Sequence, residues 1–138
     1  MGEVTVRVKL SNIIDIERIA AGESVTPRSV DVEAIVDTGA IRSVIPEHIA
    51  RELGLRVIPG RDVGLADGSR VKAGRVQGLM LEILGREVGE DALVLGDEVL
   101  IGQTTLESTD LVVDCANRTV YPNPANPDWI MKVRATRP

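Results

Sequence analysis

The residue most capable of chemistry in this chain is Asp37, which follows the apolar run Ala34-Ile35-Val36 and precedes Thr38 and Gly39. Two carboxyls that share one proton can activate water for amide hydrolysis, because one takes a proton from the water while the other gives one to the carbonyl oxygen. Thr38 can brace such a loop through its hydroxyl, and Gly39 lets the backbone turn close to the carboxylate. The Asp-Thr-Gly run occurs once in 138 residues, so a chemistry that needs two such carboxylates has only half of its residues in one chain.

Other catalytic chemistries lack the residues that they need. The sequence contains one histidine, His48, and one cysteine, Cys115, so it offers neither a metal site of ordinary composition nor an internal disulfide. Ser43 has no histidine placed to activate it, which excludes a hydrolase triad. We predict no metal and no cofactor, a solvated His48 and a buried Cys115. The plain alternative for Asp37 is an ordinary turn, in which Asp and Gly are common.

Composition and charge exclude several classes of partner. The net charge is −5 and the pI is about 4.9. This balance argues against a nucleic-acid surface, which needs clustered Lys and Arg. The longest uninterrupted apolar run, Ala92 to Leu95, is far shorter than the roughly 20 residues that span a bilayer. We therefore expect a cytoplasmic protein with no nucleic-acid or membrane partner.

Alternating apolar residues predict two strands early in the chain, over residues 4–10 and 30–36. The second strand ends directly before Asp37 and so delivers the acid. Between them, residues 12–27 break the alternation and form either a short helix or an irregular excursion. Nineteen valines and only two aromatic residues, Trp129 and Tyr121, favour further strands around an aliphatic core.

One helix is clearly indicated after the Asp37 region. Pro46 stands at its first position, Glu47 lies in the first turn where the helix dipole favours an anion, and Gly54 ends it. Ile49 and Leu53 share one face of this helix. One further helical turn is expected over residues 103–108.

The remaining residues predict short strands and turns. Asp67 and Gly68 lie between two strand-like runs, the signal of a hairpin with a two-residue type I′ turn in which both residues have positive φ. Gly85 and Gly89 separate two further strand-like runs, residues 79–84 and 91–95. Strands are expected at 43–45, 79–84, 91–95, 99–102, 111–113 and 130–133. Many short strands and a single clear helix predict an all-β, barrel-like domain.

Three features in order resemble the retropepsin-like (clan AA) aspartic peptidases, including their bacterial single-domain members. The first is the run 34–40 followed by Ser43-Val44-Ile45-Pro46, and the second is Leu100-Ile101-Gly102 before a short helix. The third is the Asp67-Gly68 hairpin between them, where that family has the flap that covers its substrate. The similarity spans about residues 28–124.

The resemblance implies a small closed acid-protease barrel with one short helix, acting as a homodimer with one Asp37 from each subunit. It divides the chain into an N-terminal strand and excursion (1–27), a retropepsin-like peptidase domain (28–124) and a C-terminal tail (125–138). The implied function is an aspartic endopeptidase that cleaves a peptide or an unfolded protein. The implied catalytic residues are Asp37, Thr38 and Gly39, and the implied substrate-binding residues are Ala40, Ala66, Asp67, Gly68, Ser69 and Gly102.

Two positions depart from the viral members of that family, which carry an acid after the Asp-Thr-Gly-Ala stretch and an arginine after the later glycine. Here these positions hold Ile41 and Gln103. Both charges are absent together, so neither is left unpaired, but the departure puts the viral type of dimer contact in doubt. The alternative function is a non-catalytic dimeric module that binds peptides or proteins. The retained Asp37 argues against this alternative, because a binding module has little need of an acid pair.

Overall fold

The computed structural model describes residues 2–131, 133 and 135, which form nine strands and three short helices. The elements in chain order are β1 (Thr5–Asn12), α1 (Ile13–Ala20), β2 (Ser29–Val36), β3 (Val44–Ile45), α2 (Glu47–Glu52), β4 (Val57–Gly64), β5 (Arg70–Ile83), β6 (Arg86–Val94), β7 (Leu100–Ile101), α3 (Gln103–Thr109), β8 (Leu111–Asp114) and β9 (Thr119–Pro122).

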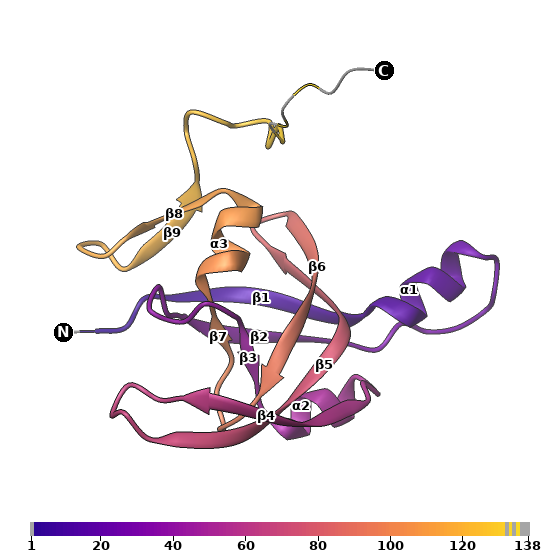
Figure 1. Cartoon of the computed structure of the whole chain (residues 1–138). Helices are drawn as coiled ribbons and strands as arrows, with labels where there is room; N and C mark the ends of the chain where they lie inside the picture. The colour runs from indigo at the N-terminus through magenta and orange to yellow at the C-terminus, as the bar shows by residue number, and fades with distance from the viewer. Residues whose placement is uncertain (1, 132, 134, 136–138) are drawn as a thin grey trace.

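Seven strands make one sheet in the order β1-β2-β7-β3-β6-β5-β4, and an additional pairing of β1 with β5 closes six of them into a ring. β4 lies outside the ring, next to β5. Figure 1 shows this barrel with the β4–β5 hairpin extending from it and the β8–β9 hairpin beside α3. The predicted all-β barrel is confirmed. Two short helices, α1 and α3, accompany the one that the sequence indicated most clearly.

The two strands predicted at the start of the chain are confirmed as β1 and β2. They pair antiparallel, from Thr5 opposite Ile35 to Ser11 opposite Ser29. β1 also pairs with the end of β5, which closes the barrel. Because β2 ends at Val36, the wall of the barrel presents Asp37 at its rim.

The core is aliphatic, as expected for a chain without Phe. Removing each large apolar side chain from water stabilises the fold by about 1.5–3 kcal/mol. The large apolar side chains that are fully buried are Leu10, Ile45, Leu53, Leu79, Leu81, Ile83 and Ile101.

Asn12 starts α1 and joins it to α2. Its Oδ1 accepts hydrogen bonds from the backbone N–H groups of Ile14 and Asp15 at 2.8 and 3.3 Å, which satisfies two donors of the first helical turn. Its Nδ2 donates to the Leu53 carbonyl at 2.7 Å. Of the two structures considered for residues 12–27, the short helix is therefore correct for Ile13–Ala20.

The helix predicted after Asp37 is confirmed as α2, although its first helical residue is Glu47 and Pro46 is its cap. Gly54 follows the helix with a φ of +67°, a conformation that favours glycine. Ile49 and Leu53 are buried on the same face, as predicted.

β5 is one continuous strand of 14 residues that includes residues 79–83 of the run predicted at 79–84 and ends before Leu84. Leu84 and Gly85 connect it to β6, and both have positive φ (51° and 80°), the conformation of a two-residue type I′ turn. Gly89 lies inside β6 opposite Met80. The prediction that Gly89 stands between strands is therefore wrong, because the chain has already turned at Leu84-Gly85.

After α3 the chain forms a separate two-stranded sheet, β8 with β9. Arg86, which is buried, donates to the carbonyls of Thr109 and Asp110 at 2.8 and 3.0 Å and to that of Asn126 at 3.0 Å.

The strand predicted over 130–133 is wrong for Ile130, which lies in irregular backbone, as do Met131 and Val133. Lys132 lies outside the described residues. In the described part of the chain, no helix is long and apolar enough to cross a membrane.

A buried carboxylate fastens α1 to the start of β2. Asp15 accepts hydrogen bonds from Nε, Nη2 and the backbone N–H of Arg28, each at 2.9 Å. These bonds, the side-chain ones foremost, lower the pKa of Asp15 from 3.8 to about 2. A lowered carboxyl pKa contributes stability that is present above the ordinary value and lost as the pH falls through the lowered value.

We expect Asp15→Asn to flatten the pH dependence of stability between about pH 4 and pH 2. The melting temperature of the wild type should fall across this window, whereas that of the variant should start lower at pH 7 and fall less. Thermal unfolding followed by circular dichroism measures both. Glu17→Gln, an exposed acid on the same helix, should follow the wild type. Parallel curves for Asp15→Asn and wild type would contradict the role of this carboxylate.

Candidate active site

The Asp37 carboxylate lies at the rim of the barrel, in the loop of residues 37–42 that we call the Asp37 loop. Asp37 donates its backbone N–H to the Ile101 carbonyl at 2.9 Å, which extends the pairing of β2 with β7. Gly39 donates its N–H to Asp37 Oδ1 at 3.0 Å, and Ala40 donates its N–H to the Asp37 carbonyl at 3.1 Å. Asp37 is partly exposed. The backbone thus holds the carboxylate while leaving it accessible.

Gly102 brings the segment after β7 against this loop. Gln103 donates its N–H to the Ala40 carbonyl at 2.7 Å, and Thr104 donates its N–H and its hydroxyl to the Ile41 carbonyl at 3.1 and 2.8 Å. A Cβ at position 102 would lie 2.5 Å from the carbonyl carbon of Arg42, a distance that backbone atoms cannot accommodate without moving. Glycine at position 102 therefore permits the close packing of the two segments.

The outer face of the Asp37 loop is open to solvent in the single chain. Thr38 and Gly39 are exposed and Ala40 is partly exposed. Ile41 is 74% exposed, beside the partly exposed Gln103. The acid and this apolar side chain are therefore both accessible to another molecule.

The tip of the β4–β5 hairpin differs from the predicted turn. Leu65 donates its N–H to the Ser69 carbonyl at 2.8 Å, and Gly68 donates its N–H to the Leu65 carbonyl at 3.0 Å. Within this tip only Gly68 has a positive φ, +87°. The loop therefore consists of three residues, Ala66, Asp67 and Gly68, and the two-residue type I′ prediction is wrong at this position.

Hydrogen bonds within the hairpin tip stiffen it. Asp67 Oδ1 accepts from Ser69 Oγ at 2.5 Å and from the Ser69 backbone N–H at 2.8 Å. The bond from the Ser69 hydroxyl is the main cause that lowers the pKa of Asp67. Residues 66–69 are all exposed, and in Figure 1 the tip and the loop after β2 point to the same side of the barrel. Among the described residues no hydrogen bond joins the tip to the Asp37 loop.

A buried polar chain behind the Asp37 loop was not predicted from the sequence. It consists of the buried hydroxyls of Thr105 and Ser43, the backbone N–H of Gly102 and, at its end, the partly exposed Glu90. Thr105 Oγ1 lies 2.6 Å from Glu90 Oε2 and 2.7 Å from Ser43 Oγ, and Gly102 donates its N–H to Ser43 Oγ at 3.1 Å. Burial raises the pKa of Glu90. The residues of this polar chain are far apart in the sequence, so no local spacing could reveal them. The one available signal is that Ser43 is a polar residue beside the apolar pair Val44-Ile45.

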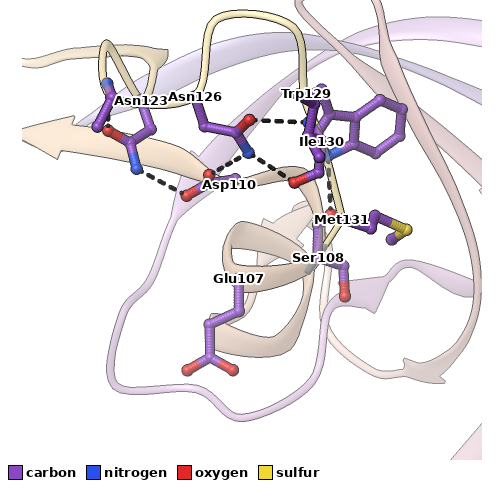
Figure 2. A pocket seen from close by; sticks show the side chains of 9 residues that line it. Glu107, Ser108, Asp110, Asn123, Asn126, Trp129, Ile130 and Met131 are labelled. Atoms are coloured by element: carbon purple, nitrogen blue, oxygen red, sulfur yellow. Dashed lines mark hydrogen bonds between the residues drawn. The ribbon is translucent and has the colours of Figure 1, made fainter. Parts of the chain in front are cut away.

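A separate hollow of about 350 Å³ lies beside the C-terminal segment. Figure 2 shows Asn126 between Asp110 and the Ile130 backbone, with Nδ2 donating to Asp110 Oδ2 at 2.9 Å and to the Ile130 carbonyl at 3.0 Å. Trp129 Nε1 donates to the Ser108 carbonyl at 3.1 Å. None of the residues predicted for the site lines this hollow, so it lies outside the candidate active site.

Two remaining sequence predictions concern His48 and Cys115. His48 is exposed on α2, as predicted. Cys115 is exposed as well, so the prediction that it is buried is wrong. It follows β8 at the start of the turn into β9, outside the aliphatic core. No three His, Cys, Asp or Glu side chains of the described residues are grouped as metal ligands would be.

Comparisons with known proteins bear on this geometry. The family model described as "gag-polyprotein putative aspartyl protease" matches residues 25–108, a range that includes the Asp37 loop, the β4–β5 hairpin and Gly102. The solved structure titled "EIAV protease complexed with the inhibitor HBY-793" is similar to this chain with a TM-score of 0.57 and 18% sequence identity, covering 77% of this chain and 86% of that chain. At this identity the structural likeness concerns the fold alone. No curated protein sequence gives a significant match.

Proposed function

Because the chain belongs to the retropepsin-like aspartyl protease family, whose model matches 25–108, we propose that it is an aspartic endopeptidase that acts as a homodimer. The catalytic pair consists of two Asp37 carboxyls, one from each subunit. Thr38 and Gly39 complete the catalytic loop of each subunit. The proposed peptidase domain covers residues 28–124, with β1 completing its barrel wall.

The observation that carries this proposal is the state of Asp37 in the single chain. Its carboxylate is positioned by backbone hydrogen bonds but stays partly exposed, in a loop that also exposes 74% of Ile41. One carboxylate is half of the pair that metal-free hydrolysis of an amide requires. A two-fold axis beside the loop would bring the two acids together and cover both Ile41 side chains.

The proposed reaction needs only water and the shared proton. Water lies between the carboxyls and its oxygen attacks the carbonyl carbon of the peptide bond, while one carboxylate takes a proton from the water. The other carboxyl gives its proton to the carbonyl oxygen, which forms a tetrahedral diol. The C–N bond then breaks as the amide nitrogen receives a proton from one carboxyl and a diol hydroxyl returns one to the other. The products are a carboxylic acid and an amine.

The proposed substrate is an extended peptide or an unfolded protein. An extended chain can bind by strand addition, with backbone hydrogen bonds supplying affinity and alternate side chains entering pockets. We assign the binding contacts to the Asp37 loop with the adjoining Gly102 and to the tip of the β4–β5 hairpin, which would serve as the flap. The contact positions are Ala40, Ala66, Asp67, Gly68, Ser69 and Gly102. The single cysteine and the acidic balance suit a cytoplasmic location.

The direct test measures cleavage and association on the same preparation. Wild-type protein is incubated with an unfolded protein substrate between pH 3 and pH 8, and the products are sequenced by mass spectrometry. Sedimentation velocity gives the oligomeric state. We expect internal cleavage sites and a dimer. A protein that is monomeric, or that cleaves nothing across this range, would favour a module that only binds peptides or proteins.

The pH profile of cleavage should pass through a maximum. The pair works when it holds one proton, so the rate declines on the alkaline side as both carboxyls lose their protons and on the acidic side as both gain one. Initial rates on a peptide with no ionisable side chains, measured from pH 3 to pH 9, give this profile. A rate that stays flat up to pH 9 would contradict a carboxyl pair.

A further inference from the structure

The buried polar chain joins the two backbone segments that hold the Asp37 loop. Ser43 directly follows the loop, and Gly102 begins the segment whose amides bind the loop carbonyls. The hydrogen bond from Gly102 N–H to Ser43 Oγ, 3.1 Å long, ties these segments together. It lies one residue from Ile101, whose carbonyl accepts the N–H of Asp37. A displacement of Ser43 would therefore move the backbone at both ends of the Asp37 loop.

An ionised Glu90 fixes the direction in which the two buried hydroxyls donate their hydrogen bonds. A carboxylate can only accept, so Thr105 donates its proton to Glu90, at 2.6 Å from Oε2. Ser43 can then donate to Thr105 Oγ1 at 2.7 Å. This leaves Ser43 Oγ as the acceptor for the Gly102 N–H. Every proton in the chain then has an acceptor.

A neutral side chain at position 90 no longer fixes the direction of these hydrogen bonds. A protonated carboxyl or an amide can donate as well as accept, so Thr105 can turn its own proton toward Ser43. The Ser43 proton then loses Thr105 as its acceptor. Ser43 and Thr105 are 1% and 0% exposed, so water cannot replace the lost acceptor without a movement of the surrounding backbone.

We propose that Glu90 is a positioning residue for the Asp37 loop, because its carboxylate orients the buried hydroxyls so that Ser43 holds the Gly102 amide. The catalytic consequence rests on the proposed peptidase function. The positioning itself concerns hydrogen bonds within one chain and can be measured without any cleavage.

The surroundings of Glu90 disfavour the ionised form of its carboxyl. Burial raises its pKa, and the neighbouring charge of Asp91 acts in the same direction. The hydrogen bond from Thr105 opposes the rise in pKa, as does the positive charge of Arg42. A raised carboxyl pKa contributes stability that is complete below the ordinary value and lost as the pH rises through the raised value. Ionisation of Glu90 therefore lowers the stability of the fold while it orients the loop.

The first test compares Glu90→Gln with wild type by amide hydrogen exchange at neutral pH. We expect the protection of the Gly102 and Gln103 amides to fall about five- to tenfold, as for the loss of one hydrogen bond. The melting temperature at pH 7 should not fall, because a glutamine at position 90 carries no charge that its partly buried site would disfavour. Glu87→Gln, an exposed acid on the same strand, should leave both quantities unchanged. Unchanged protection in Glu90→Gln, or a fall that Glu87→Gln shares, would overturn the positioning role.

The pH dependence of the same amides separates positioning from packing. In the wild type, protection corrected for intrinsic exchange should drop to the level of Glu90→Gln as the pH falls and Glu90 takes up its proton. The variant should show no such step. A step of equal size in both proteins would overturn the role of the Glu90 charge. Repeating the measurement in Asp37→Asn protein should give the same result, so failure of the peptidase proposal would leave this readout unaffected.

A matched pair at position 105 tests the link between Glu90 and Ser43. Thr105→Ser keeps the hydroxyl and should retain the protection of the Gly102 amide, whereas Thr105→Val keeps the shape and should lose it. In cleavage assays Glu90→Gln should lower kcat about five- to tenfold with KM unchanged, since the change concerns the catalytic loop and no substrate pocket. If Thr105→Val protects the amide as well as Thr105→Ser does, the hydroxyl chain does not position the loop. Cleavage by Glu90→Gln at the wild-type rate, with reduced protection, would overturn the catalytic consequence alone.

Discussion

Asp37→Asn is expected to lower the rate of peptide cleavage by at least about 10³-fold, because one substitution removes both carboxyls of the proposed pair and general acid–base catalysis contributes about 10²–10⁴-fold. An amide cannot take a proton from water at the pH of the assay, and it cannot share a proton with its copy. The fold should persist, since Asn keeps the shape of Asp and the Gly39 N–H still finds an oxygen acceptor at position 37. Cleavage kinetics and sedimentation velocity on the purified variant measure the two expectations separately.

Asp31→Asn is the matched control for this experiment. Asp31 is an exposed acid on β2, the strand that ends at Asp37, and its replacement should leave the rate within the error of the wild type. Mixing wild type with an excess of Asp37→Asn protein adds a sharper requirement. Mixed dimers hold only one carboxylate, so the activity per wild-type chain should fall as the variant is added. Activity that is insensitive to the added variant would show that each chain works alone, which a shared pair does not allow.

Gly102→Ala is expected to destabilise the fold by about 3 kcal/mol, the upper end of the range for overpacked positions. The added methyl group would lie 2.5 and 2.6 Å from the carbonyl carbon and oxygen of Arg42 and 3.0 Å from the Ala40 carbonyl oxygen. All three atoms belong to backbone, so relief requires the Asp37 loop or the segment after β7 to move. Equilibrium unfolding in urea measures the free energy, and cleavage should fall together with stability because the displaced loop carries Asp37.

Gly64→Ala is the control for the glycine at position 102. A Cβ at Gly64 would meet no atom within 4 Å, and its backbone does not require a positive φ. Its free energy of unfolding should stay within about 0.5 kcal/mol of the wild type, as for other surface changes. Equal and small effects of the two substitutions would mean that the segment after β7 does not pack against the Asp37 loop as closely as the distances indicate.

Local patterns predicted several elements because the physical cause of each is local. The alternation at residues 4–10 and 30–36 reflects one buried and one solvated face, and both strands are present as β1 and β2. Helix α2 followed from Pro46 and Gly54, which restrict the backbone at its two ends. The turn predicted at Asp67-Gly68 was wrong in type, while the type I′ geometry occurs at Leu84-Gly85. Leu84 accepts a positive φ there because the register of β5 against β6 leaves only two residues for the connection.

The candidate site was only partly visible in the sequence. Asp37 and Gly102 were found because the family pattern marks both positions, and the structure brings their segments together through the hydrogen bond between Asp37 N–H and the Ile101 carbonyl. Glu90 was missed, because nothing local distinguishes it from Glu87, an exposed acid of the same strand. Cys115 was placed in the core by its residue type alone, whereas its position after β8 exposes it.

The amino-acid sequence by itself determined the strand pattern, the aliphatic composition of the core and the identity of the acid at the rim, because each depends on residue type and on neighbours within a few positions. Only the tertiary structure decided which backbone supports that acid and which buried polar groups lie behind it. Ser43, Glu90 and Thr105 approach one another through the closure of the barrel and the docking of α3. Contacts of this kind arise from packing across long stretches of chain, which no spacing along the sequence records.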